Sequence, residues 1–243
     1  MHSNECKYKF SWILISFQRQ NTTLEIIIVY VLLRRLLMFY SKDEDVQKKV
    51  ATIERFSLLT LGNIKACSEM LGTMKKHDEY LYQHAYNVAR LSTIIGVEYS
   101  FNLHELQNIY IGGILHDIGK IYLNQEILYK PDFLNNDERI FIEAHTNLGY
   151  KALKPLGLDP LVLNIVKSHH EKLNGNGYPD MLSVDEIPIF VQIVTVADIY
   201  DALSNKRSYR AALSREKIFK IMENDDGLNQ MAVSLIKEVA EKE

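Results

Sequence analysis

Ionisable residues that follow apolar runs constrain this fold more than any other feature of the sequence. They are His116 and Asp117 after IGGIL, His145 after IFIEA, His169 and His170 after LVLNIV, and Asp198 after IPIFVQIVTVA. His84 lies at helical spacing between Tyr80 and Val88, so it is expected on the apolar face of its helix. One such histidine is more often a satisfied core residue than a ligand, but burying so many ionisable groups without partners would be very costly. A shared metal centre resolves that cost.

The residue types narrow the choice of metal. Five histidines and two aspartates, with no thiolate, exceed the four ligands of a structural zinc site and suit two ions with coordination numbers near six. We therefore predict a dinuclear iron or manganese centre. Adjacent His116 and Asp117 diverge by about 100° on a helix, so the carboxylate can bridge two ions while the histidine binds one. Lys120, one turn further on, is expected to reach the same cleft without being a ligand.

The small number of prolines and glycines, together with the helix-capping patterns, predicts an all-α fold, and the buried ionisable residues place a metal centre in the core of this helical bundle. Only 5 prolines and 11 glycines occur in 243 residues, which is sparse for a β-sandwich. Capping boxes predict helix starts at Asn102 and Asn135, with Glu105 and Glu138 as partners. Further starts are predicted at Asp159-Pro160, Pro188 and Ser214. Residues 187–197 are β-branched enough for a buried strand, but their continuation into DIYDAL favours a buried helix.

Residues 1–45 are expected to form an N-terminal extension, and residues 46–243 the main domain. In the apolar segment 24–40, Glu25 and the pair Arg34-Arg35 leave runs well short of the roughly 20 residues that a membrane span needs. No small-residue cleavage pattern of a signal peptide follows it. We predict no membrane span and interpret the segment as a packing element, either a remnant of a regulatory domain or a dimer-forming segment.

Charge and cysteine content limit the partners and the compartment. A net charge of −3 offers no broad basic surface for a nucleic acid polymer, so an anionic ligand is expected to meet a local cluster of cations. Cys6 and Cys67 lie far apart and form no metal-ligand pair. We therefore expect a reducing, cytoplasmic location without a disulfide framework.

Three segments carry a resemblance to a known family. They are HDIGK (116–120), HHEKLNGNGYP (169–179) and VADIYDALSNKRSYR (196–210). Together with His84 and His145 in the same order, they resemble the HD-GYP family, a subset of the HD phosphohydrolase superfamily that hydrolyses the bacterial second messenger cyclic di-GMP. The resemblance runs from about Asp78 to the C-terminus. It implies that residues 46–243 form an HD-type helical bundle, an HD-GYP phosphohydrolase domain. It also implies a phosphodiesterase that converts cyclic di-GMP to pGpG, to GMP or to both, by means of a metal-activated water.

The resemblance also implies roles for individual residues. The metal ligands fall on His84, His116, Asp117, His145, His169, His170 and Asp198. Asp117 would bridge the two ions, and Lys120 would assist as the second catalytic residue at the phosphate or leaving oxygen. The implied substrate-binding residues are Gly177, Tyr178, Arg207 and Arg210.

The Gly-Tyr-Pro loop and three departures from the family pattern bear on these roles. Gly175 and Gly177 are expected to adopt backbone conformations closed to other residues, which lets the loop approach metals and substrate. Asn174 stands where the family usually has aspartate, which is expected to affect loop order rather than metal binding. Gln192 stands where the family usually has arginine, at a position that is expected to serve packing or an internal ion pair. Tyr80 replaces a glutamate that recruits a third metal in some members, which favours two ions here.

Two other functions are compatible with the residues. An HD phosphohydrolase acting on another nucleotide would keep His116, Asp117 and Asp198 but would not need the Gly-Tyr-Pro loop. A non-catalytic HD-GYP signalling module would bind a partner protein through that loop, although the complete ligand set argues against it. Cyclic di-GMP is the expected small-molecule partner, and a homodimer is a further hypothesis.

Overall fold

The computed structural model describes residues 45–130, 132–205 and 213–241. Within these ranges the regular elements are all helical and no strand occurs, which confirms the predicted all-α fold. The longer helices are α3 (Asp45–Asn63), α4 (Lys65–His77), α5 (Glu79–Glu98), α6 (Leu103–Leu115), α9 (His145–Leu153), α10 (Pro160–Ser168), α11 (Ile189–Ser204), α12 (Arg215–Glu223) and α13 (Gln230–Glu241). The short ones are α7 (Gln125–Leu128), α8 (Asn136–Glu143) and the 3₁₀ helices η1 (Ile118–Tyr122), η2 (Lys154–Leu156) and η3 (Val184–Glu186).

The predicted helix starts are confirmed. Helices α6 and α8 each begin with a complete capping box, Asn102 with Glu105 and Asn135 with Glu138. The other predicted starts match α10 after Asp159, α11 after Pro188 and α12 after Ser214. The ambiguous apolar stretch 187–197 supplies most of α11, because DIYDAL continues the same helix to Ser204. Its β-branched side chains pack on several sides of a buried helix rather than on one face of a sheet.

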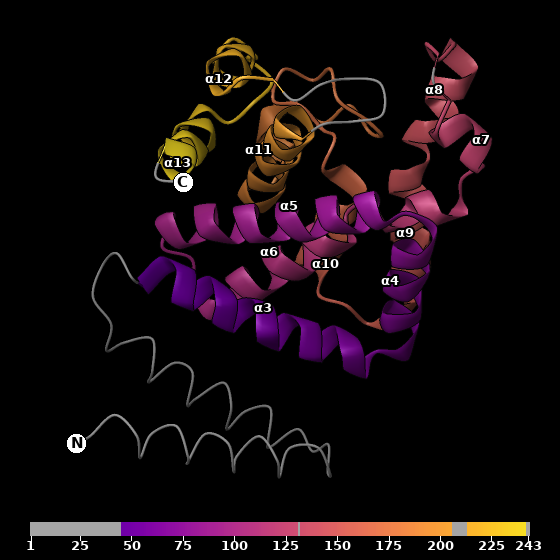
Figure 1. Cartoon of the computed structure of the whole chain (residues 1–243), viewed down its shortest axis with the longest axis horizontal. Helices are drawn as coiled ribbons and strands as arrows, with labels where there is room; N and C mark the ends of the chain where they lie inside the picture. Colours follow the sequence, from indigo (N-terminus) through magenta and orange to yellow (C-terminus); the bar gives the residue numbers. More distant parts are fainter. Residues whose placement is uncertain (1–44, 131, 206–212, 242–243) are drawn as a thin grey trace. The chain divides into compact units, whose positions relative to one another are not determined.

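Four helices build the core next to the candidate site. Helix α5 packs against α6 and α11, and α6 also packs against α10, as Figure 1 shows. Val88, Ile109, Ile165 and Val194 contribute fully buried side chains from these four helices. Each such burial contributes about 1.5–3 kcal/mol relative to an exposed side chain. The hydrophobic core therefore fixes the helices that carry the histidines and aspartates.

A second apolar cluster lies against α5 and α6 and includes side chains of α3 and α4. Leu61, Met74, Leu115 and Ile118 are buried there. Beside it, η1 approaches the start of α9 so closely that a Cβ atom at Gly119 would collide with the carbonyl oxygen of His145. The glycine of HDIGK thus lets the segment after α6 contact the start of α9.

Two expectations for the N-terminal part concern residues outside the described ranges. No helix of the described residues is both long and apolar enough to cross a membrane. The apolar segment 24–40 is not among them, so its packing or dimer-forming role and the boundary near residue 45 stay predictions.

Cys67 is a buried free thiol, and burial raises its pKa.

Candidate metal centre

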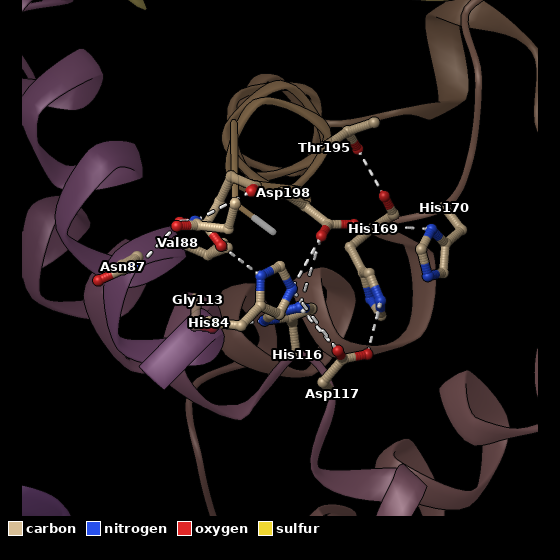
Figure 2. Close-up of polar contacts among 12 residues, drawn as sticks. His84, Asn87, Val88, Gly113, His116, Asp117, His169, His170, Thr195 and Asp198 are labelled. Atoms are coloured by element: carbon tan, nitrogen blue, oxygen red, sulfur yellow. Dashed lines mark hydrogen bonds and ion pairs between the residues drawn. The ribbon is translucent and has the colours of Figure 1, made fainter. Parts of the chain in front are cut away.

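All seven predicted metal ligands converge in one place, and they come from five different helices or their ends. His84 lies on α5, His116 and Asp117 directly follow α6, His145 begins α9, His169 and His170 directly follow α10, and Asp198 lies on α11. Figure 2 shows the side chains of His84, His116 and His169 gathered around Asp117, with Asp198 on the facing helix. Six of the seven side chains are buried, and that of the seventh, His170, is 25% exposed.

The ligand atoms form two groups. Asp117, His145, His169 and His170 make up one group, and His84, His116 and Asp198 the other. Within each group the candidate atoms lie within 4.8 Å of one another. Imidazole and carboxylate donors without a thiolate suit ions such as iron and manganese. These two buried groups could each hold a metal ion, in agreement with the predicted dinuclear centre.

Asp117 lies between the two groups and directs one oxygen to each. Its Oδ2 is 3.4 Å from Nε2 of His116 and 3.8 Å from Nε2 of His84. Its Oδ1 is 3.3 Å from Nε2 of His145 and 3.8 Å from Nε2 of His169. The carboxylate is therefore placed as a residue that bridges two ions would have to be.

Two atoms at this point are buried without a hydrogen bond. They are Nε2 of His116 and Oδ1 of Asp117, and each faces the space between the ligand candidates. A buried polar atom without a partner costs about 1–3 kcal/mol. Metal coordination would satisfy both atoms, so the residues present fit the metal centre that the sequence predicts.

Hydrogen bonds at Nδ1 orient the ligand histidines. In three of them Nδ1 lies next to a backbone carbonyl oxygen: His116 with Gly113 at 2.6 Å, His145 with Ile142 at 2.7 Å and His169 with Val166 at 3.1 Å. A carbonyl oxygen can only accept, so Nδ1 carries the proton and Nε2 keeps the lone pair that faces the centre. His84 differs, because its Nδ1 lies 2.7 Å from Oδ2 of Asp201.

Burial keeps most of these imidazoles neutral. Desolvation, with smaller contributions from neighbouring charges, lowers the pKa of His145 to about 4 and that of His170 to about 3. It lowers the pKa of His169 well below the ordinary value. Neutral imidazole is the form that binds a metal ion. These three residues are therefore in the ligating state at neutral pH.

Charge pairing dominates at the other residues. Burial alone would lower the pKa of His84, but its hydrogen bonds to Asp198 and Asp201 outweigh this and raise that pKa to about 9. Burial alone would raise the pKa of Asp117, but the neighbouring charges of Lys120 and His116 hold it well below its usual range. Asp198 is likewise held ionised, mainly by His84, against the effect of burial. Both carboxylates therefore carry the negative charge that a bound cation would neutralise.

Lys120 reaches the centre, as predicted. It lies on η1, and its Nζ donates a hydrogen bond of 2.6 Å to Oδ2 of Asp117. Its side chain is one-fifth exposed, so the ammonium group lies at the edge of the buried cluster. The expected assistance at the phosphate or leaving oxygen stays a prediction.

The Gly-Tyr-Pro loop packs against the centre. The ring of Tyr178 lies against the ring of His170, with the centroids 4.6 Å apart and the planes inclined by 30°. The buried carboxylate of Glu171 accepts hydrogen bonds from the backbone N–H groups of Asp180 at 2.7 Å and Leu182 at 3.0 Å. The loop therefore returns to the ligand pair and is held there by the ring of His170 and the carboxylate of Glu171.

The two loop glycines serve different purposes. Gly175 has a φ of 75°, which confirms the expected special conformation. Gly177 has no positive φ, so the same expectation was wrong for it. A Cβ atom at Gly177 would instead collide with the backbone of Glu171 and Lys172. Gly177 is required for the close approach of two stretches of chain.

Asn174 and Gln192, which depart from the family pattern, both form hydrogen bonds with other parts of the chain. Asn174 donates a hydrogen bond of 2.6 Å to Oδ1 of Asp226, in the turn between α12 and α13. An aspartate at position 174 would instead place two carboxylates together. Gln192 donates to the carbonyl oxygen of Ile187 at 2.8 Å and accepts from Asn229 at 2.7 Å. Gln192 thus links α11 to its neighbours, in keeping with the expected packing role.

Some site residues lie outside the described ranges, and others were missed by sequence reasoning. Arg207 and Arg210 fall within residues 206–212, so their substrate-binding roles stay predictions. The sequence interpretation assigned no role to Asp201 or to the loop-holding Glu171. The position of Asp201 on the helix face of Asp198 could have been predicted, because the two residues are three positions apart, but its contact with His84 could not.

The family assignment follows from this arrangement and from one comparison. A family model described as HD domain matches residues 67–230. The chain belongs to the HD domain family. The structure is similar to that of an HDG"Y"P protein from Bdellovibrio bacteriovorus, at a TM-score of 0.58 and 16% identity, covering 86% of this chain and 68% of that one. At this identity the match supports the fold of the HD domain alone.

Curated relatives of this HD domain are named as phosphodiesterases. The chain is 31% identical over 156 residues to 3'3'-cGAMP-specific phosphodiesterase 1 of Vibrio cholerae, covering 64% of this chain and 36% of that protein. It is 34% identical over 162 residues to a cyclic di-GMP phosphodiesterase of Thermotoga maritima, covering 65% and 44%. The chain thus spans between a third and a half of the length of these relatives.

Proposed function

We propose that this HD domain is a metal-dependent phosphodiesterase for cyclic dinucleotides and that cyclic di-GMP is its substrate. The observation that carries the proposal is the pair of ligand groups with Asp117 between them, one oxygen of its carboxylate facing each group. A pair of metal ions, when bound, activates a water and neutralises the charge of a phosphoryl group during in-line displacement. The names of the relatives from Vibrio cholerae and Thermotoga maritima support the substrate class.

The residues of the chain itself would hold the substrate and stabilise charge. His170 is the exposed member of the ligand set, so the scissile phosphate would approach on that side, beside the ring of Tyr178. Lys120 holds its ammonium group 2.6 Å from Asp117. From there the cation would stabilise negative charge that develops on the phosphate or the leaving oxygen in the transition state.

A cyclic dinucleotide has a second phosphate that cannot occupy the same centre. We assign it to Arg207 and Arg210, which are three residues apart in the sequence. Guanidinium groups suit phosphate oxygens because they donate two parallel hydrogen bonds. Gly177, next to Tyr178, would let the loop backbone come close to the nucleotide.

Two observations favour cyclic di-GMP over other nucleotides, and a third keeps 3'3'-cGAMP as the nearest competitor. The ligand set includes both His169 and His170, and the Gly-Tyr-Pro loop packs on His170. A phosphohydrolase for mononucleotides would need neither feature. Relatives named for 3'3'-cGAMP and for cyclic di-GMP are similar to this chain at comparable identity, 31% and 34%.

Hydrolysis by the whole purified chain tests the proposal. The chain is purified anaerobically and supplied with Fe²⁺ or Mn²⁺, and kcat/KM is measured for cyclic di-GMP, 3'3'-cGAMP and a purine mononucleotide. We expect cyclic di-GMP to be cleaved best. A preference for 3'3'-cGAMP contradicts the choice of substrate but not the reaction class. Two bound ions without any hydrolysis would favour the non-catalytic signalling module.

Location and protein partners are further parts of this proposal. The cytoplasmic location is part of the proposal and rests on the two cysteines of the sequence, which lie far apart. The homodimer and a signalling protein that binds the Gly-Tyr-Pro loop stay hypotheses. Size measurement in solution tests the first, and retention of a partner by the chain but not by a Tyr178→Ala variant tests the second.

A further inference from the structure

Asp201 is a buried carboxylate that lies beside the metal centre without belonging to either ligand group. It stands on α11, three residues after Asp198, and only 3% of its surface is exposed. Its Oδ2 lies 2.7 Å from Nδ1 of His84. Its Oδ1 accepts hydrogen bonds from the side-chain amides of Asn87 and Asn205, each at 2.9 Å. The carboxylate is therefore fixed on one side and directed at His84 on the other.

This arrangement sets His84 apart from the other ligand histidines. His116, His145 and His169 direct Nδ1 at neutral backbone carbonyl groups of their own chain segments. His84 directs it at a charged side chain on another helix. Hydrogen bonds to an ionised acceptor are roughly twice as strong as those between neutral groups. At Nδ1, the orientation of His84 therefore depends on one removable side chain.

We propose that Asp201 is a positioning residue that holds His84 in place for one of two metal ions, the ion bound by His84, His116 and Asp198. The inference rests on the metal centre of the proposed function but is independent of the substrate. Asp201 keeps the proton on Nδ1 of His84, so Nε2 faces the centre, where it lies 3.0 Å from Oδ1 of Asp198. Asp201 contacts no member of the other ligand group, so its effect is confined to one ion.

Metal binding by an Asp201→Asn variant of the full chain tests the inference. Asparagine keeps the size of the side chain but removes its charge. Titration of the metal-free protein with Mn²⁺, followed by calorimetry, should give one ion bound as in the unsubstituted chain and a second bound about 10 to 100-fold more weakly. Two ions bound with unchanged affinities, or both weakened equally, contradict the inference.

A matched control removes a carboxylate at the start of α5, the helix that carries His84. Asp78 caps the start of α5, where its side chain accepts a hydrogen bond from the backbone N–H of Leu81. Asparagine caps helices about as well as aspartate, so Asp78→Asn should leave both metal affinities unchanged. A similar loss in Asp78→Asn would mean that the effect reflects α5 as a whole and not the contact with His84.

A double substitution separates positioning from general support of the fold. His84→Gln removes the ligand itself and should also leave one tightly bound ion. If Asp201 acts through His84, adding Asp201→Asn to His84→Gln should change the affinities by less than about twofold. A further loss as large as that in the single variant would show that Asp201 supports the fold, and would overturn the inference.

The ring nitrogen of His84 that carries the proton can be identified by NMR without any substitution at Asp201. In ¹⁵N-labelled, unsubstituted chain loaded with the diamagnetic ion Zn²⁺, we expect His84 to carry its proton on Nδ1 and the metal on Nε2. Metal on Nδ1 contradicts the inference, even if Asp201→Asn does not fold. If the unsubstituted chain binds no metal, both the proposed function and this inference are contradicted. The other contradictory outcomes given above affect the inference alone.

Discussion

Lys120 donates a 2.6 Å hydrogen bond to Oδ2 of Asp117, the carboxylate oxygen that faces His84 and His116. The lysine therefore contacts the same oxygen as His84 and His116, whereas Oδ1 faces His145 and His169. A cation in this place neutralises charge at the edge of the centre and remains close to where a phosphoryl group would bind. Its contribution should accordingly appear in turnover rather than in metal retention.

Replacement of Lys120 by alanine tests that distinction. We expect Lys120→Ala to keep both ions and to lose kcat by about a hundredfold or more, because a cation near the leaving oxygen acts most strongly as charge develops. Elemental analysis and steady-state kinetics measure the two effects. Lys65→Ala, which changes a largely exposed lysine on α4, serves as the control. Loss of metal from Lys120→Ala would show that the lysine holds the centre together.

Replacement of Asp117, unlike that of Lys120, should remove the metal ions. Because each oxygen of Asp117 faces a different ligand group, Asp117→Ala should lose metal and hydrolysis together. Metal content after extensive dialysis, measured beside that of Lys120→Ala, checks this. An Asp117→Ala chain that still holds two ions would exclude the bridging role.

The two arginines outside the described residues are tested through the substrate. Arg207→Ala and Arg210→Ala should each raise KM for cyclic di-GMP by roughly tenfold, or about 1.4 kcal/mol, with unchanged metal content. Bis(p-nitrophenyl) phosphate lacks a second phosphate, so its hydrolysis should change far less. Equal losses on both substrates would mean that the arginines support the fold or the metal site.

The hydrogen bond between Asn174 and Asp226 predicts that the loop stays ordered when the amide and the carboxylate exchange positions, but not when both positions carry a carboxylate. Asn174→Asp should place two carboxylates together, loosen the Gly-Tyr-Pro loop and raise KM for the substrate several-fold. The effect on global stability should stay within about 0.5 kcal/mol, because both side chains are at the surface. Adding Asp226→Asn should restore KM, since an amide can again donate to a carboxylate. Persistence of the defect in the double variant would assign position 174 another role.

Much of the fold and the ligand set could be predicted because the relevant patterns are local in the sequence. The capping boxes at Asn102 and Asn135 involve residues three positions apart. The histidines that follow apolar runs had to be buried, and a buried ionisable group needs a partner. Their convergence into one centre follows from that cost, even before the arrangement of helices is known.

The features that sequence reasoning missed depend on contacts between distant segments. Asp201 meets His84 across 117 residues, and Asn174 meets Asp226 across 52. Gly177 is required by the backbone that lies next to it, which no dihedral preference reveals. Such partners become visible only when helices and loops are placed against one another.

The central claim is that this HD domain holds two metal ions and uses them to hydrolyse cyclic di-GMP. The most direct test counts metal ions per chain in anaerobically purified protein and measures hydrolysis of cyclic di-GMP in the same sample. We predict two ions per chain, of iron or manganese, and hydrolysis that disappears on chelation and returns when the metal is restored. Less than one ion per chain, with no hydrolysis after Fe²⁺ or Mn²⁺ is added, would contradict the account.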